Sequence, residues 1–393
     1  NNLLFCGAPG SLNHYYDEVS YGQLTIVGTI PTGWVTSAHN LAWWGDDTVP
    51  NTPPHVDDAN GPIYNLVREA LTLADPYIDY AAYDSDGDHK VENDEVSLCI
   101  IHAGDGQEST GNEYDIWSHR WVIGGGSLVL DGVDWGGHGY WMQAETSPLG
   151  VFCHEFGHEL GLPDLYDTDY SSDGIGDWGL MAHGAWNGWP PGSSPAHPCA
   201  WSKIQLGWIT PTEIDPALFY NNVVVPCIEE NAVAFKLSYT ATEYFLVVNR
   251  IRTGYDSALP GEGILIWHID ESMPDNTDEN HKLVDLEEAH GGVQDLDFYG
   301  GNRGDSYDPY YDREYPDGFT DTTDPNSKAY DGSSTGVMVT DIGPIHEYTT
   351  VDFGQPVEDL EAVSQSHPHD AVTQGTIEPV DVTIKNNGAS TLT

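Results

Sequence analysis

The chain has 393 residues and carries 63 acidic against 12 basic side chains, a formal net charge of −51. This charge argues against nucleic acid as a partner and against anionic membrane surfaces, because both depend on clustered lysine and arginine. A disordered chain is also excluded, since 39% of the residues are apolar and 13 are tryptophan. No apolar run is long enough to predict a membrane span. The length predicts two or three domains.

The first half of the chain predicts a mixture of helices and strands. Apolar side chains recur at helical spacing after Pro62, which suits a first helical turn, and again around residue 152. A glycine-rich stretch between them indicates hairpins and loops. The predicted elements are helices over 62–75, 148–160 and 196–206, a strand over 96–103 and hairpins over 124–141.

Strand-length apolar runs replace the helical pattern from about residue 220. An acidic, polar stretch over 270–324 interrupts them. The final segment, 357–393, contains DVTIKNNG, which resembles the opening strands of an immunoglobulin-like module. Such a sandwich needs roughly 100 residues, so this segment is expected to be incomplete. The predicted strands cover 222–228, 232–239, 244–251, 263–270, 337–343 and 349–354.

Five cysteines occur, and none are spaced as CxxC, which argues against a zinc ribbon or a redox pair. A bridge between Cys199 and Cys227 is one interpretation, and the odd count leaves at least one thiol free. The start at Asn1 is interpreted as a processed or trimmed end.

The strongest motif is His154-Glu155-Phe156-Gly157-His158. Two histidines four residues apart lie on the same helical face, so both imidazoles could bind one zinc ion. Glu155 would lie beside them, where it could accept a proton from a zinc-activated water.

The motif continues to Gly161 and Asp164, completing the pattern HExxHxxGxxD. Gly161 would let the helix end with a positive φ, and the chain would then return a third ligand. A carboxylate is an ordinary zinc ligand, so Asp164 is the expected third ligand, with Asp167 as the alternative.

HEFGHELGLPDLYDTD followed by WGLMAHGAW resembles the immune inhibitor A (M6) family of secreted metalloproteases, in the metzincin group. Similar segments occur over about residues 3–355. The resemblance implies zinc-dependent endopeptidase activity on protein or peptide substrates, secretion to the extracellular space or cell surface, and structural calcium. It also implies a methionine turn beneath the zinc ion, matched here by Met181.

The fold expected from these patterns is α+β, in three parts. Residues 1–210 would form a metzincin-like catalytic domain with an active-site helix, and 211–356 a β-rich acidic domain packed on it. Residues 357–393 would begin an immunoglobulin-like (CARDB-like) module, through which copies of the chain could associate.

Two further histidines are candidates for supporting the zinc site. Some metzincins carry a tyrosine two residues after the turn methionine, and His183 occupies that position here. His183 could assist catalysis, although a structural hydrogen bond is the simpler interpretation. His119, in the segment WSHRW, is a candidate of the same kind.

Acidic clusters predict calcium sites. The first is spaced as an oxygen-ligand loop but lacks the EF-hand glycine, because His89 stands at that position. The second follows the zinc motif, and others fall within 270–324. A solvated acidic face is the alternative for each cluster. The candidate ligands are Asp84, Asp86, Asp88, Glu92 and Glu95; Asp167, Asp169, Asp173 and Asp177; and Asp295, Asp297, Asp305 and Asp308.

The leading interpretation is therefore a secreted zinc endopeptidase with Glu155 as general base and calcium as stabiliser. The alternative is an extracellular surface or filament protein built on a protease fold. The incomplete C-terminal segment motivates that alternative, and the intact Glu155 argues against it.

Overall fold

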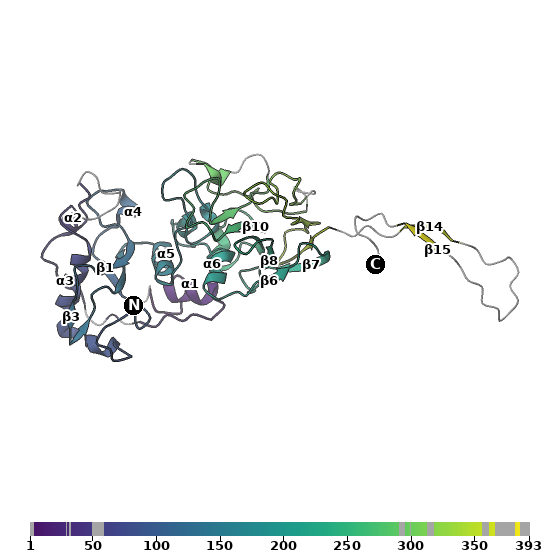
Figure 1. Cartoon of the computed structure of the whole chain (residues 1–393). Coiled ribbons are helices and arrows are strands. Elements are labelled where there is room, and N and C mark those ends of the chain that lie inside the picture. The colour runs from purple at the N-terminus through teal and green to yellow at the C-terminus, as the bar shows by residue number, and fades with distance from the viewer. Residues whose placement is uncertain are drawn as a thin grey trace, which may run out of the picture.

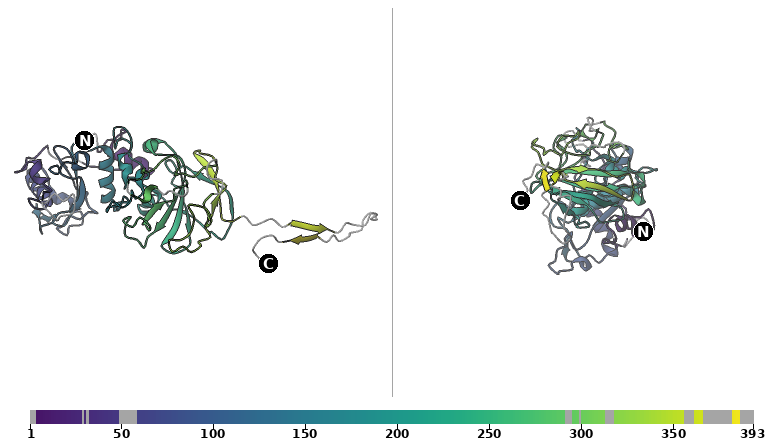
Figure 2. Two further views of the ribbon diagram at one scale, coloured as in Figure 1. Left: turned by 90° about the horizontal axis from the view of Figure 1, so that it is seen from above. Right: turned by 90° about the vertical axis from the view of Figure 1, so that its right-hand side faces the viewer.

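The computed structural model is an elongated molecule in which the described α-helices all end by Gln205 and strands predominate after it (Figure 1). The helices α2 (Leu41–Trp44) and α3 (Tyr64–Ala74) lie at one end, α1 (Leu12–Val19) and the HExxH helix α5 (Leu149–Glu159) in the middle, and the strands of the second half beyond them (Figures 1 and 2). The structure describes residues 4–28, 30, 33–48, 59–290, 295–298, 300–312, 318–355, 361–365 and 382–385.

The described helices are few and short, as expected for an α+β chain. The α-helices are α1 (Leu12–Val19), α2 (Leu41–Trp44), α3 (Tyr64–Ala74), α4 (Gln107–Thr110), α5 (Leu149–Glu159) and α6 (Ala200–Gln205). None of these described helices has the length and apolarity needed to cross a membrane.

A three-stranded sheet with the order β1-β5-β2 supports the N-terminal half. Strand β5 pairs parallel with β1 and antiparallel with β2. A hairpin joins β3 to β4 through Asp131 and Gly132, both with positive φ (50° and 88°), as a tight two-residue turn requires. The strands are β1 (Cys99–His102), β2 (His119–Val122), β3 (Val129–Leu130), β4 (Val133–Asp134) and β5 (Gly139–Ala144).

The second half is built on a five-stranded sheet with the order β11-β10-β9-β8-β6. A smaller sheet, β12-β13-β7, packs beside it across a shared core. These strands are β6 (Thr212–Ile214), β7 (Tyr220–Pro226), β8 (Phe235–Ser238), β9 (Glu243–Arg250), β10 (Gly263–Asp270), β11 (Val284–Leu286), β12 (Val339–Thr340) and β13 (Tyr348–Phe353).

Both faces of β9 and β10 are buried, which explains their nearly continuous apolar sequences. Successive side chains of a strand point to opposite faces. Leu246 and Trp267 therefore join the core beneath the zinc-motif helix, whereas Val247 and Ile266 join the core shared with β7 and β13.

The core beneath the zinc motif is continuous across residue 210. It contains Tyr16 of α1, Phe156 of α5 and Trp178 together with Trp267 of β10. The predicted division into 1–210 and 211–356 thus runs through a shared hydrophobic core, and it stays a prediction.

The structure confirms three of the predicted helices and contradicts the predicted disulfide. The helices predicted over 62–75, 148–160 and 196–206 correspond to α3, α5 and α6. The possible bridge between Cys199 and Cys227 was wrong, because both thiols are buried and free. Of 357–393, only β14 (Glu361–Gln365) and β15 (Val382–Lys385) are described, as an antiparallel pair. The rest of the predicted immunoglobulin-like segment lies outside the described residues.

Candidate metal centre

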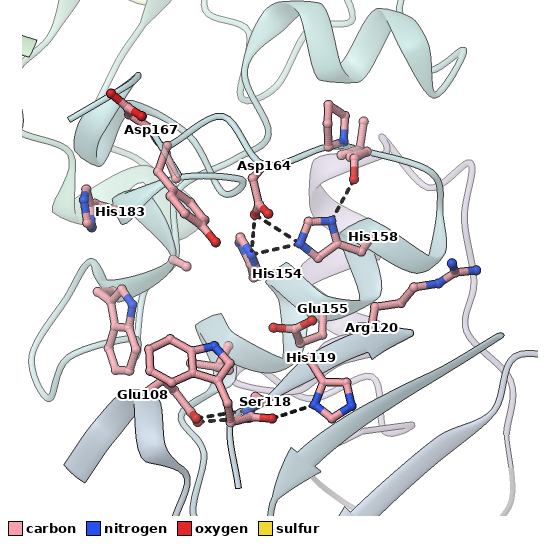
Figure 3. Close-up of a pocket in the computed structure, with 18 of the residues that line it drawn as sticks. Glu108, Ser118, His119, Arg120, His154, Glu155, His158, Asp164, Asp167 and His183 are labelled. Atoms are coloured by element: carbon pink, nitrogen blue, oxygen red, sulfur yellow. Dashed lines mark hydrogen bonds and ion pairs between the residues drawn. The ribbon is translucent and has the colours of Figure 1, made fainter. Parts of the chain in front are cut away.

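Helix α5 presents His154 and His158 one turn apart, and the chain after it returns Asp164. Gly161, directly after the helix, has a φ of +97°, a left-handed conformation that favours glycine. This turn redirects the chain toward the histidines. The side chains of His154, His158 and Asp164 point toward one another in Figure 3.

The three ligand atoms form a nearly equilateral triangle. His154 Nε2 lies 3.2 Å from His158 Nε2 and 3.2 Å from Asp164 Oδ1, and His158 Nε2 lies 3.1 Å from the same oxygen. Tetrahedral zinc with bonds of about 2.0–2.1 Å separates its ligand atoms by about 3.3–3.4 Å. The triangle therefore fits a zinc ion bound above its centre, with the fourth position open.

Hydrogen bonds at the far side of each ring fix the histidine tautomers. His154 Nδ1 lies 3.0 Å from the Leu180 carbonyl oxygen, and His158 Nδ1 lies 2.8 Å from that of Leu162. A carbonyl only accepts, so each Nδ1 donates and each Nε2 keeps its lone pair for a metal.

The chemistry of the triangle also fits a cation. Burial disfavours ionisation of the Asp164 carboxyl, yet the adjacent histidines hold its pKa well below its usual range. Burial likewise disfavours charge on His154, but Asp164 outweighs it and raises the pKa of His154 to about 9. Asp164 Oδ1 is buried and has no hydrogen-bond donor. A divalent cation would satisfy this carboxylate with both rings neutral.

Glu155 lies next to the triangle in the same cavity (Figure 3). Only 6% of this residue is exposed, and its Oε2 atom has no hydrogen-bond partner. Burial raises the pKa of the Glu155 carboxyl. A buried, unpartnered carboxylate with a raised pKa is suited to accepting and returning a proton.

These residues line a cavity of about 1200 Å³ that contains the three predicted zinc ligands and Glu155. Its opposite wall holds Glu108, whose carboxylate accepts hydrogen bonds from Ser118 and Ser147. Sequence reasoning missed Glu108, since it follows no recognisable motif and belongs to the four-residue helix α4. Trp121 also lines the cavity and is 61% exposed, which offers an apolar surface to a ligand.

The two supporting histidines lie on the cavity walls. The ring of His119 is bonded at both nitrogens, to the Trp117 carbonyl at 2.7 Å and to the Tyr140 hydroxyl at 3.1 Å. Burial lowers the pKa values of both His119 and His183 to about 4. His183 lies 3.8 Å from Asp173. Both rings are therefore neutral near pH 7.

Met181 packs directly against the zinc-motif helix. A Cβ atom at Gly157 would lie 2.6 Å from Met181 Sδ, so the glycine within the motif allows this contact. The Met181 carbonyl accepts the Leu165 N–H at 2.8 Å, which ties the methionine turn to the segment carrying Asp164. The turn thus supports both the helix and the segment that carries Asp164.

The predicted third-ligand alternative, Asp167, has other partners. Its carboxylate accepts hydrogen bonds from Ser171 and from both the main chain and the hydroxyl of Ser172. Asp164 reaches both histidines instead, so the geometry favours Asp164.

The first predicted calcium loop brings Asp84, Asp86 and Asp88 together, with ligand atoms within 4.8 Å of one another. Glu92 pairs with Lys90 at 2.6 Å. Glu95 accepts hydrogen bonds from Glu92 N and from Ser85, which lower its pKa to about 2. Glu95 therefore stabilises the loop backbone.

The other acidic candidates are dispersed in the part of the chain that the structure describes. Asp169 accepts the Ser171 N–H, Asp173 faces His183, and burial raises the pKa of Asp177 to about 6. Asp297 pairs with Lys282, while Asp295 and Asp305 both accept from Asn302. Only Asp308 of these joins a three-residue cluster, with Glu288 and His290.

Residues 8–209 match the family described as immune inhibitor A peptidase M6, catalytic domain. The chain belongs to this metalloprotease family. It is 36% identical over 209 residues to immune inhibitor A of Bacillus thuringiensis subsp. alesti, a match spanning 47% of this chain and 30% of that protein. It is 32% identical over 219 residues to the pre-pro-metalloprotease PrtV of Vibrio cholerae serotype O1 (strain M66-2), spanning 49% of this chain and 23% of that one.

The match confirms the family that the motifs indicate. Both matched regions cover less than a third of the relatives' own lengths. The matched range, residues 8–209, includes His154, Glu155, His158, Asp164 and Met181. The β-rich second half lies outside that range.

Proposed function

We propose that this chain is a zinc-dependent metalloendopeptidase of the metzincin type that hydrolyses peptide bonds in proteins or peptides. The observation that carries the proposal is the triangle of His154, His158 and Asp164, with Glu155 buried and unpartnered beside it. Zinc bound by these three residues would supply a Lewis acid that activates water and polarises a carbonyl.

The chain's own residues would perform the proton transfers. Glu155 accepts a proton from the attacking water and returns it to the amine that leaves when the peptide bond breaks. Burial raises the Glu155 pKa, which makes its carboxylate a stronger base for the first of these two transfers. The carbonyls of Leu180 and Leu162 keep the histidines oriented throughout.

The test is Glu155→Gln, assayed on a denatured protein substrate. Removing a general base typically costs about 10²–10⁴-fold in rate. Glu213→Gln is the matched control, because Glu213 is exposed on β6, within the five-stranded sheet. Glu155→Gln with zinc still bound should be inactive, and the control should keep full activity. A Glu155→Gln protein with full activity would refute the mechanism. In the active chain, a chelator should abolish hydrolysis and added zinc restore it.

Calcium binding at Asp84, Asp86 and Asp88 is part of the same proposal. Gly87 and His89 have positive φ values of 79° and 70°, which curl the loop around these carboxylates. Secretion into a calcium-rich environment would suit such a site. Calcium titration of the chain and of Asp86→Asn tests it, with weaker binding expected in the variant. The structural-protein alternative gains no support, because the cavity retains an arrangement suited to hydrolysis.

A further inference from the structure

A second cluster of metal-binding side chains lies away from the zinc triangle. Glu288, His290 and Asp308 place one ligand atom each within 4.8 Å of one another. Glu288 and His290 lie shortly after β11, where the chain enters a turn at residues 289–290. Between them, Ala289 donates its N–H to the Asp308 carbonyl at 2.9 Å, which holds the two segments together.

Asp308 is completely buried, and only one of its two carboxylate oxygens accepts hydrogen bonds. Its Oδ2 atom accepts hydrogen bonds from Trp178 Nε1 and the Asp305 N–H, both at 2.8 Å. Its Oδ1 atom has no hydrogen-bond partner and lies 3.8 Å from His290 Nδ1, which also has none. Two unsatisfied buried atoms thus face each other at a distance too long for a hydrogen bond.

Glu288 is completely buried too, and its two oxygens accept the N–H groups of Asp295 (2.9 Å) and Leu296 (3.2 Å). Such acceptor geometry suits an ionised carboxylate. A cation in the cluster would reconcile the buried charge with this geometry.

We propose that Glu288, His290 and Asp308 form a second metal site that binds a divalent transition metal, with zinc as the expected ion. Imidazole nitrogens and carboxylate oxygens are both zinc ligands, and this cluster offers one of the first and two of the second. Calcium and magnesium prefer oxygen ligands only, so the histidine disfavours them.

The neighbouring acids have other partners, which defines the ligand set. Asp297 pairs with Lys282. Asp295 and Asp305 both accept hydrogen bonds from Asn302, at 2.9 and 2.8 Å. Among the residues that the structure describes, Glu288, His290 and Asp308 are the ones that form the cluster, and Asp295 Oδ2 lies 3.8 Å from His290 Nε2.

The site would stabilise one wall of the active-site cavity. Leu296 O accepts the Asp173 N–H at 3.0 Å, and Arg303 O accepts the Asp177 N–H at 2.7 Å. Arg303 and Asp173 both line the cavity. An ion bound by both Glu288 and Asp308 would hold Leu296 and Arg303 against Asp173 and Asp177, on the side of the active-site cavity that Asp173 lines.

The experiment counts zinc per chain by elemental analysis after equilibrium dialysis at a fixed free-zinc concentration. The wild-type chain should bind two zinc ions and His290→Ala one. His281→Ala is the matched control, a histidine that pairs with Asp270 elsewhere in the acidic region, and it should keep both. Combining His154→Ala with His158→Ala should remove only the other ion, which separates this proposal from the proposed function.

A second readout does not depend on the catalytic site. Cobalt added to the His154→Ala, His158→Ala chain should give a visible absorption band that His290→Ala abolishes. The proposal is overturned if His290→Ala binds as much zinc as wild type, or if calcium at equal concentration displaces the second ion.

Discussion

Arg250 offers a direct test of what holds the two halves of the molecule together. Its guanidinium is fully buried at the end of β9 and contacts Glu229 Oε1 at 2.9 Å and Asp256 Oδ2 at 2.5 Å. Its Nη1 also donates to the Trp178 carbonyl at 3.3 Å. Arg250 thus connects the β-rich half to the segment that leads into Met181.

Replacing Arg250 with methionine keeps much of the volume and removes the charge. Burial raises the pKa of Glu229 to about 8, so Glu229 can become neutral, and Asp256 is left as a buried charge without its guanidinium partner, although it still accepts the His197 N–H. Breaking a buried ion pair by removing one partner costs about 3–5 kcal/mol. The lost bond to Trp178 adds about 1 kcal/mol. We expect Arg250→Met to lower the free energy of unfolding by about 4–6 kcal/mol.

The measurement is urea unfolding followed by far-ultraviolet circular dichroism at constant zinc and calcium. With a slope of about 3 kcal/mol/M, the midpoint should fall by about 1.3–2 M. Arg252→Met is the control, because Arg252 is exposed and bonds only carbonyl groups through its side chain. Its midpoint should move by less than about 0.4 M. Equal shifts in the two variants would refute the assigned role of Arg250.

Three further predictions concern the zinc-motif helix and the cavity. Gly150→Ala would place a Cβ atom 1.7 Å from the Ala185 carbonyl oxygen, so calorimetry should show a loss of about 3 kcal/mol or more. Gly161→Ala meets nothing within 4 Å but forces alanine to a φ of +97°, so the same measurement should show only about 1–2 kcal/mol; a larger loss there than at Gly150 would contradict the comparison. Because burial lowers the pKa of His119 to about 4, the unfolded chain binds a proton that the folded chain excludes between about pH 6.5 and 4. The free energy of unfolding should therefore fall as the pH drops from about 6.5 to 4. The slope of this free energy against pH should be shallower in His119→Phe, and identical slopes in the two proteins would refute the role given to His119.

Helix α5 could be predicted because the pattern of its HExxH motif is local in sequence. Histidines four residues apart lie on the same face of a helix one turn apart, and α5 supplies that helix. The positive φ predicted for Gly161 is confirmed at +97°. Sequence spacing left Asp164 and Asp167 as alternatives, and only the folded chain shows Asp167 occupied by serine side chains.

Features that depend on distant segments escaped prediction. Helix α1 was not predicted, although Tyr16 within it donates a 2.6 Å hydrogen bond to the Cys153 carbonyl in α5. Glu108 enters the cavity because Ser118 and Ser147, from other elements, hold its carboxylate. Glu288 and His290 looked like part of a general acidic stretch. Their proximity to Asp308 depends on strand pairing that the sequence does not reveal.

The segment from Trp178 to Met181 connects these distant features. Its Leu180 carbonyl orients His154, and its Trp178 ring bonds Asp308 of the proposed second metal site. Its Trp178 carbonyl accepts from Arg250. The four residues from Trp178 to Met181 are therefore bonded to His154, to Asp308 and to Arg250 of the five-stranded sheet. Removing the contact with Asp308 or with Arg250 should therefore change the affinity of the proposed zinc site, because His154 can keep its orientation only while Leu180 stays in place.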